Sequence, residues 1–154
     1  CRKTNGKVFA SKPLCISGKL VKDFWFEFKD GVIVDFGASE NYESLKSFLE
    51  TDEGAKRLGE VALLSYDSPI SNLGRVFFNG LIDENASCHM AVGMSFAYNI
   101  KDGEKLSEEQ LKEHGSNISN VHLDFMFGTA DMSCIGIDQN DKEVVVFKDG
   151  NFVF

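Results

Sequence analysis

Two polar residues stand close together in an apolar segment near the end of the chain. His122 and Asp124 are separated by one residue within NVHLDFMFG, residues 120–128. Because side chains alternate faces along a strand, the two point to one side and the apolar residues around them point to the other. A carboxylate beside a core is costly unless it is paired or binds a cation. An imidazole nitrogen and a carboxylate oxygen suit zinc, cobalt or manganese, so the pair is a candidate metal clamp.

The pair alone also fits a simple Asp–His hydrogen bond on a half-solvated sheet face. Two more residues favour a metal. His89 lies among small and apolar residues in NASCHMAVG, and Glu60 begins the apolar run EVALL after a glycine. Singly, they are typical of an interior histidine and of a solvent-facing strand end. Together with the pair, they form a ligand set suited to hydrolysis by metal-bound water, with one or two ions.

The remaining histidine has a different explanation. His114 stands directly before Gly115, at the expected end of a short exposed helix that begins after Ser107. A cation is favourable at a helix C-terminus, so we expect His114 to lie outside the metal site.

Composition limits the classes of function that this chain can have. The 154 residues fit one domain, residues 1–154. A net charge of −8 disfavours nucleic acid and anionic membranes as partners. The longest apolar runs are too short to cross a bilayer, and no signal-peptide pattern is visible. We therefore expect a cytoplasmic protein that binds neither nucleic acid nor membrane.

The cysteines do not form a zinc-finger pattern. None of the four is in a C-x-x-C pair, and such scattered cysteines in a domain of this size are typical of reduced thiols in a cytosolic protein. They are Cys1, Cys15, Cys88 and Cys134.

The elements that must position the candidate ligands are mostly strands. Alternating apolar residues, among them Phe24, Phe26 and Phe28, and two KDG turns predict antiparallel hairpins. The sequence therefore predicts an α+β fold with a mainly antiparallel sheet, hairpins and a few interspersed helices. Strands are expected over residues 7–14, 19–28, 32–36, 60–64, 75–82, 121–127, 133–138, 142–147 and 151–154.

Four helices are expected between these strands. Helical spacing of apolar residues predicts the first, and capping residues and terminal glycines predict the others. The third would begin at the N-cap Asp83 and would carry His89 in its middle, with Ala86, Met90 and Gly93 near one face. The expected ranges are 41–50, 51–59 (capped by Thr51 or Asp52 and ended by Gly59), 83–94 and 107–115.

Long segments of the chain resemble one enzyme family in matching order. GEVALLSYDSPIS, LIDENASCHMAVG, NVHLDFMFG and FKDGNF, together with the opening strands and TDEGAKRLGE, are similar to the C-terminal part of the thermophilic-type metallo-aminopeptidases, which include aminopeptidase T, aminopeptidase S and PepS. The resemblance covers nearly the whole chain. It implies a cytosolic enzyme that removes N-terminal residues from peptides, and a homodimer in the full-length protein.

The resemblance also implies a metal centre. On matching positions the ligands of a dinuclear site would be Glu60, His89, His122 and Asp124, the residues already selected by their chemistry. The divalent ions would be zinc, cobalt or manganese. A further glutamate ligand would come from an N-x-P-T-E-E segment upstream of Cys1, so we expect a C-terminal, metal-binding domain of a longer aminopeptidase. Phe96 stands where the family usually has a tyrosine.

Two other functions fit the same residues. One is a catalytically inert metal-binding or dimerisation domain, in which the four residues form a polar cluster. The other is an iron oxygenase, whose facial triad also uses H-x-D on a strand. In that class the second histidine should follow the H-x-D pair, whereas His89 precedes it.

Overall fold

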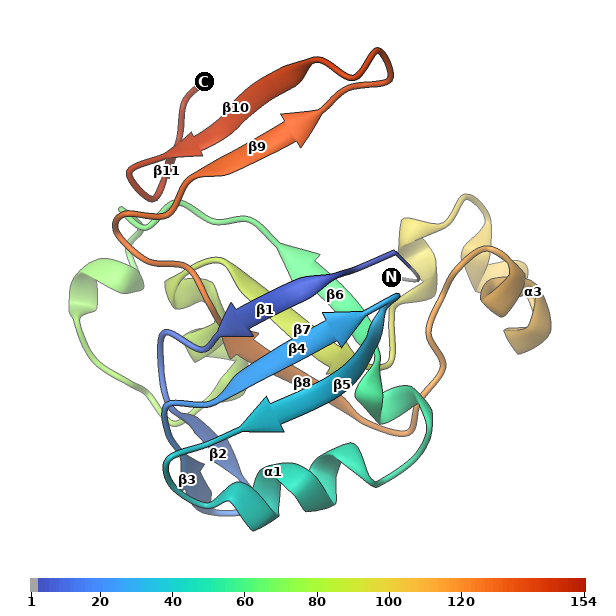
Figure 1. The fold of residues 1–154 in the computed structure, drawn as a ribbon, viewed down its shortest axis with the longest axis horizontal. Helices are drawn as coiled ribbons and strands as arrows, with labels where there is room; N and C mark the ends of the chain where they lie inside the picture. The colour runs from blue at the N-terminus through green and yellow to red at the C-terminus, as the bar shows by residue number, and fades with distance from the viewer. Residues whose placement is uncertain (1–2) are drawn as a thin grey trace.

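Antiparallel strands dominate the computed structural model, which describes residues 3–154 (Figure 1). There are two three-stranded sheets with strand orders β1-β4-β5 and β6-β7-β8, a separate β2-β3 hairpin that lies between β1 and β4 in the chain, and a β11-β10-β9 sheet at the end. The expected α+β class is therefore confirmed. The strands are β1 (Gly6–Phe9), β2 (Leu14–Ile16), β3 (Lys19–Val21), β4 (Trp25–Lys29), β5 (Val32–Gly37), β6 (Leu58–Ala62), β7 (His89–Gly93), β8 (His122–Met126), β9 (Cys134–Ile137), β10 (Glu143–Lys148) and β11 (Asn151–Phe152).

Helical segments between the strands are short. Three are α-helices: α1 (Tyr42–Leu49), α2 (Gly80–Asp83) and α3 (Glu108–Glu113). The others are single 3₁₀ turns: η1 (Gly54–Lys56), η2 (Ser71–Leu73), η3 (Glu84–Ala86), η4 (Ala97–Asn99) and η5 (Gly103–Lys105). None of the described helices, within residues 3–154, is long and apolar enough to cross a membrane.

Phenylalanine rings join the first sheet to the second. Phe24, Phe26 and Phe28 are almost fully buried on the β4 side of the core. Phe125 of β8 meets the rings of Phe24 and Phe26 edge-on, with centroid distances of 5.9 Å and 5.1 Å. Edge-to-face pairs are favourable beyond the apolar area they bury. One face of β8 is thus fixed against the core, which leaves its other face for polar residues.

The sequence signals at several turns and ends are confirmed. Asp30 and Gly31 both have positive φ in the first KDG turn, and Asp149 and Gly150 do so in the second. Such turns match the right-handed twist of antiparallel strands. Helix α3 has the expected N-cap, because Ser107 and Gln110 form a reciprocal capping box.

The expected helix over residues 83–94 is wrong in its second half. Helix α2 and η3 end at Ala86, Ser87 is fully extended (φ −166°, ψ 179°), and His89 begins strand β7. The run HMAVG consists of small and apolar residues, for which a helical and a strand pattern are hard to separate by periodicity. Pairing with β6 on one side and β8 on the other decides the conformation.

The expected strand over residues 75–82 is also wrong, because α2 begins at Gly80 and the preceding residues form a loop. The carboxylate of Asp83 accepts hydrogen bonds from the backbone N–H groups of Phe77 (2.8 Å) and Asn79 (3.0 Å). These donors therefore pair with a side chain and not with a neighbouring strand.

The expected helix over residues 51–59 is reduced to the single turn η1. Asp52 caps this turn as expected, since its Oδ1 accepts a hydrogen bond from the backbone N–H of Ala55 at 2.9 Å. Gly59 does not end a helix but lies inside β6, at an irregularity in the pairing with β7. A Cβ there would stand 2.5 Å from the carbonyl oxygen of Gly93, so a side chain at this position would separate the two strands.

Three of the cysteines lie in the part of the chain that the structure describes. Cys15 is exposed on β2, Cys88 is buried, Cys134 is partly buried, and all three are free thiols. Burial raises the pKa of the Cys88 thiol, which favours its neutral form. Cys1 lies outside the described residues.

We expect Phe26→Ala to lower the free energy of unfolding by about 3–5 kcal/mol, because it removes a ring in contact with several others in the core. Val34→Ala is the control, since Val34 is 56% exposed on β5. It should cost less than about 1 kcal/mol. Urea unfolding followed by circular dichroism measures both. Equal losses for the two variants would contradict the assigned core.

Candidate metal centre

The outer face of the β6-β7-β8 sheet brings residues from three strands into one row. Glu60 on β6 pairs with Ala91 on β7, and Ala91 pairs with Asp124 on β8. Ala91 is fully buried, and its methyl group is the smallest side chain that could stand between two carboxylates. The longer side chains of Glu60 and Asp124 can therefore approach each other above Ala91.

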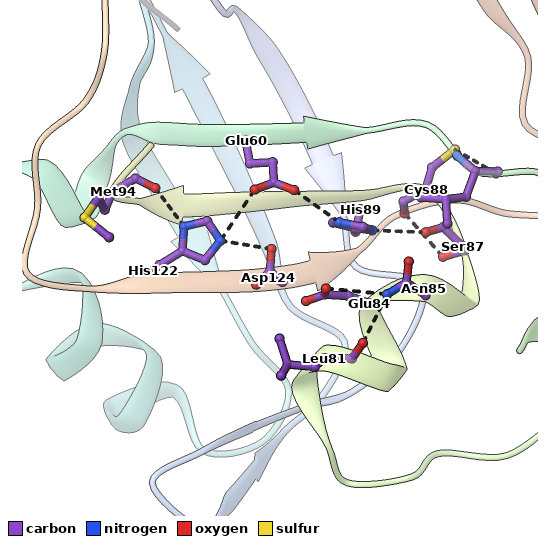
Figure 2. Close-up of polar contacts among 11 residues, drawn as sticks. Glu60, Leu81, Glu84, Asn85, Ser87, Cys88, His89, Met94, His122 and Asp124 are labelled. Atoms are coloured by element: carbon purple, nitrogen blue, oxygen red, sulfur yellow. Dashed lines mark hydrogen bonds and ion pairs between the residues drawn. The ribbon is translucent and has the colours of Figure 1, made fainter. Parts of the chain in front are cut away.

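All four residues selected from the sequence meet on this face (Figure 2). Nε2 of His89 lies 3.5 Å from Oε1 of Glu60, and Nε2 of His122 lies 3.7 Å from Oε2 of Glu60. Nε2 of His122 also lies 3.2 Å from Oδ1 of Asp124. One ligand atom each from Glu60, His89 and Asp124 lies within 4.8 Å of the others. We call Glu60, His89, His122 and Asp124 the His–carboxylate cluster.

Backbone carbonyls orient both imidazole rings of the cluster. Nδ1 of His122 lies 2.7 Å from the carbonyl oxygen of Met94, and Nδ1 of His89 lies 3.4 Å from that of Ser87. A carbonyl can only accept, so each Nδ1 carries the proton and each Nε2 faces the carboxylates. Metal-binding histidines are commonly held in this way, with the other nitrogen available as a ligand.

The cluster retains a proton when no other cation is present. The hydrogen bond to Asp124 is the main cause that raises the pKa of His122 to about 9, with contributions from the Met94 carbonyl and the charges of Asp124 and Glu60, against the opposing effect of burial. The positively charged imidazolium thus balances the carboxylates. A metal ion that took this place would displace the Nε2 proton, so metal binding should release a proton near neutral pH.

Glu84 is a further carboxylate that the sequence analysis did not select. It follows α2, below Asp124 in Figure 2, and burial followed by the nearby charge of Asp124 raises its pKa. Its signal in the sequence was weak, because one glutamate in IDENAS is typical of a solvated helix end. Glu84 precedes His89 by five residues. This spacing indicates a place near the cluster only when His89 is known to begin a strand.

Of the two other residues noted in the sequence, Phe96 contacts the cluster and His114 does not. The ring of Phe96 contacts the imidazole of His122, with centroids 4.9 Å apart, and stacks on Tyr98. Phe96 therefore packs against a cluster residue but has no hydroxyl to offer it. His114 is the exposed C-cap of α3, as expected, and is not among the cluster's polar contacts.

The sequence profile of the family described as thermophilic metalloprotease (M29) matches residues 1–152. Aminopeptidase 2 of Geobacillus stearothermophilus is 47% identical over 150 residues, which are 97% of this chain and 36% of that protein. Aminopeptidase T of Thermus aquaticus is 42% identical over 151 residues, 98% of this chain and 36% of that protein. The chain thus spans just over a third of the length of these curated relatives.

A solved structure has nearly the same fold. The chain described as wild-type AmpT from Thermus thermophilus superposes with a TM-score of 0.91 at 38% sequence identity. The match covers 99% of this chain and 38% of that chain.

Zinc should stabilise the protein through the His–carboxylate cluster. At a hundredfold excess over Kd, binding to the native state alone adds about 2.7 kcal/mol. We expect a rise in melting temperature of about 5–10 °C for a protein of this size. His122→Ala and Asp124→Ala should lose most of this rise, whereas His114→Ala should keep it. If zinc raised the melting temperature of His122→Ala as much as that of the parent, His122 would not be a ligand.

The metal-free protein should lose stability as the pH rises. Because the pKa of His122 is about 9 when folded and about 6.5 when unfolded, its contribution is complete below pH 6.5 and is lost as the pH rises to about 9. Partial solvent exposure limits the loss to about 1–3 kcal/mol. Urea unfolding in the presence of a chelator, at pH 6 and pH 9.5, measures it. His122→Gln should show a smaller loss, and an equal loss would assign the effect to other groups.

Proposed function

This chain belongs to the thermophilic metalloprotease family M29, and from this we propose that it is the metal-binding C-terminal domain of a metal-dependent aminopeptidase. The relatives that it matches are named aminopeptidases. The observation that carries the proposal is the convergence of Glu60, His89 and Asp124, whose ligand atoms lie within 4.8 Å of one another, with His122 beside them. The substrates would be peptides with a free amino terminus.

The donor atoms fit divalent ions of borderline or hard character. Two imidazole nitrogens and several carboxylate oxygens suit zinc, cobalt or manganese. Glu60 directs Oε1 to His89 and Oε2 to His122, so its carboxylate would help both histidines to hold divalent ions. Glu84 would add a carboxylate on the Asp124 side. The remaining glutamate would come from upstream of Cys1, as the resemblance implies.

The chain's own residues would bind and orient the reactants. When bound, divalent ions lower the pKa of water to near neutrality and polarise a carbonyl group. His89 and His122 would hold their Nε2 atoms toward the reaction site, because their Nδ1 atoms are tied to the backbone.

The partners, the oligomeric state and the location of the protein are part of the same proposal. The net charge of −8 disfavours nucleic acid as a partner. A homodimer of the full-length protein and a cytoplasmic location are proposed from the family resemblance alone.

The proposal predicts metal-dependent release of N-terminal residues by the full-length natural protein. With zinc, cobalt or manganese it should hydrolyse L-leucine p-nitroanilide, and residues 1–154 alone should show little turnover. Glu60→Gln should lower kcat/KM at least about a hundredfold, since a substitution in a metal site costs affinity and activity. His114→Ala is the control with unchanged activity.

An N-acetylated substrate separates this function from its rivals. N-acetyl-L-leucine p-nitroanilide should not be cleaved, because it lacks the free ammonium group. Turnover that survives a chelator or is unchanged in Glu60→Gln would overturn the proposal. A full-length protein that binds metal but cleaves no peptide would instead support the inert domain.

A further inference from the structure

The peptide group between Met94 and Ser95 is held from both of its ends. Its N–H, on Ser95, donates a hydrogen bond to the backbone carbonyl of Asn117 (3.0 Å). Its C=O, on Met94, accepts the hydrogen bond from Nδ1 of His122 (2.7 Å; Figure 2). Because a trans peptide group is planar, its N–H and C=O point in opposite directions. The contact with Asn117 therefore fixes the direction in which the Met94 carbonyl meets His122.

Asn117 is a buried residue whose hydrogen bonds lie on both sides of Met94. Only 6% of its surface is exposed. Its side-chain Nδ2 donates to the carbonyl oxygens of Gly93 (2.6 Å) and Gly54 (2.9 Å), so both amide hydrogens are used. Its backbone N–H donates to Oγ of Ser95 at 2.8 Å. A shift of this segment would leave buried donors without acceptors, which is costly, so Asn117 holds the chain around Met94 in place.

Two glycines allow the Met94 carbonyl to lie close to β6. A Cβ at Gly59 would stand 2.6 Å from the Met94 carbonyl oxygen. Gly93 has a φ of 101°, and a Cβ there would overlap the carbonyl oxygen of Val121. The carbonyl that orients His122 therefore lies directly against the residue before Glu60. This contact fixes the imidazole of His122 relative to the strand that carries Glu60.

We propose that Asn117 is a positioning residue for the metal centre. Through the Met94 carbonyl it directs Nε2 of His122 toward Glu60 and Asp124, and so it sets the affinity of the cluster for a divalent ion. The inference rests on the metal centre of the proposed function and adds a residue that binds no metal itself. Asn117 acts on the His122 side alone, because the imidazole of His89 is oriented by the carbonyl of another segment, at Ser87.

A double-mutant cycle on zinc affinity tests the route through His122. In the full-length natural protein, Asn117→Ala should weaken zinc binding at least about tenfold, the usual effect of losing support for a metal ligand. In the His122→Ala background the same change should weaken it less than about twofold, because the residue that Asn117 positions is already gone. Competition with a fluorescent zinc chelator measures all four proteins. Equal weakening in both backgrounds would overturn the proposal.

Two further variants separate positioning from a general loss of stability. Asn117→Asp keeps the size of the side chain but turns an acceptor toward two carbonyl oxygens, so it should weaken zinc binding at least as much as Asn117→Ala. Ile33→Ala is the control, since Ile33 is buried in the first sheet, away from the cluster. It destabilises the fold by creating a cavity but should change zinc affinity less than about twofold. A loss of affinity in Ile33→Ala as large as in Asn117→Ala would overturn the proposal.

A measurement without metal separates this inference from the proposed function. With a chelator present, nuclear magnetic resonance of the protein labelled with ¹⁵N-histidine should show the Nδ1–H of His122, identified by its loss in His122→Gln. Asn117→Ala should speed the exchange of this proton with water at least about tenfold, which corresponds to losing one hydrogen bond, and Ile33→Ala should not. Faster exchange in a protein that hydrolyses no peptide would support the positioning role and contradict the aminopeptidase function. Unchanged exchange in Asn117→Ala would overturn the positioning role alone, whatever the activity.

Discussion

The arrangement of this domain depends on the need to neutralise several carboxylates on one sheet face. Glu60, Glu84 and Asp124 are close enough for their charges to affect one another, and burial raises the pKa of Glu84 further. Like charges this close are relieved by a neighbouring cation or by protonation of one carboxyl group. In the metal-free protein, protonated His122 supplies that charge. A divalent ion would take the same position and bind the same donor atoms. The excess of carboxylates therefore accounts both for the raised pKa of His122 and for the proposed metal binding.

The apolar side of the sheet makes this polar side possible. The rings of Phe24 and Phe26 and the ring of Phe125 fix β8 against the core. Alternation along β8 then directs His122 and Asp124 outward. Small residues set the distances on the outer face. Ala91 leaves room between two carboxylates, and Gly59 permits close contact between β6 and the backbone that follows β7. A larger side chain at either position would separate the ligands or the strands.

Strand alternation was readable from the sequence because it is a local property. The H-x-D pair, the KDG turns and the Ser107 cap depend on residues within a few positions of one another, and the structure agrees with them. The pairing of strands that lie far apart in the sequence could not be predicted. His89 is in a strand because β6 and β8 flank it, and Glu84 becomes relevant only through its distance from Asp124. The structure places His89 beside Glu60, although periodicity gave His89 the wrong secondary structure.

Anomalous X-ray scattering from crystals of the zinc-loaded full-length protein, measured at the zinc absorption edge, is the most direct test of the metal site. We expect a strong peak on the outer face of the β6-β7-β8 sheet. The peak should lie about 2.0–2.2 Å from a carboxylate oxygen of Glu60 and Nε2 of His89 or His122. A second peak that shares Glu60 would establish the dinuclear form. A cluster without a peak, in crystals where zinc binds elsewhere, would show that Glu60, His89, His122 and Asp124 do not form the metal site.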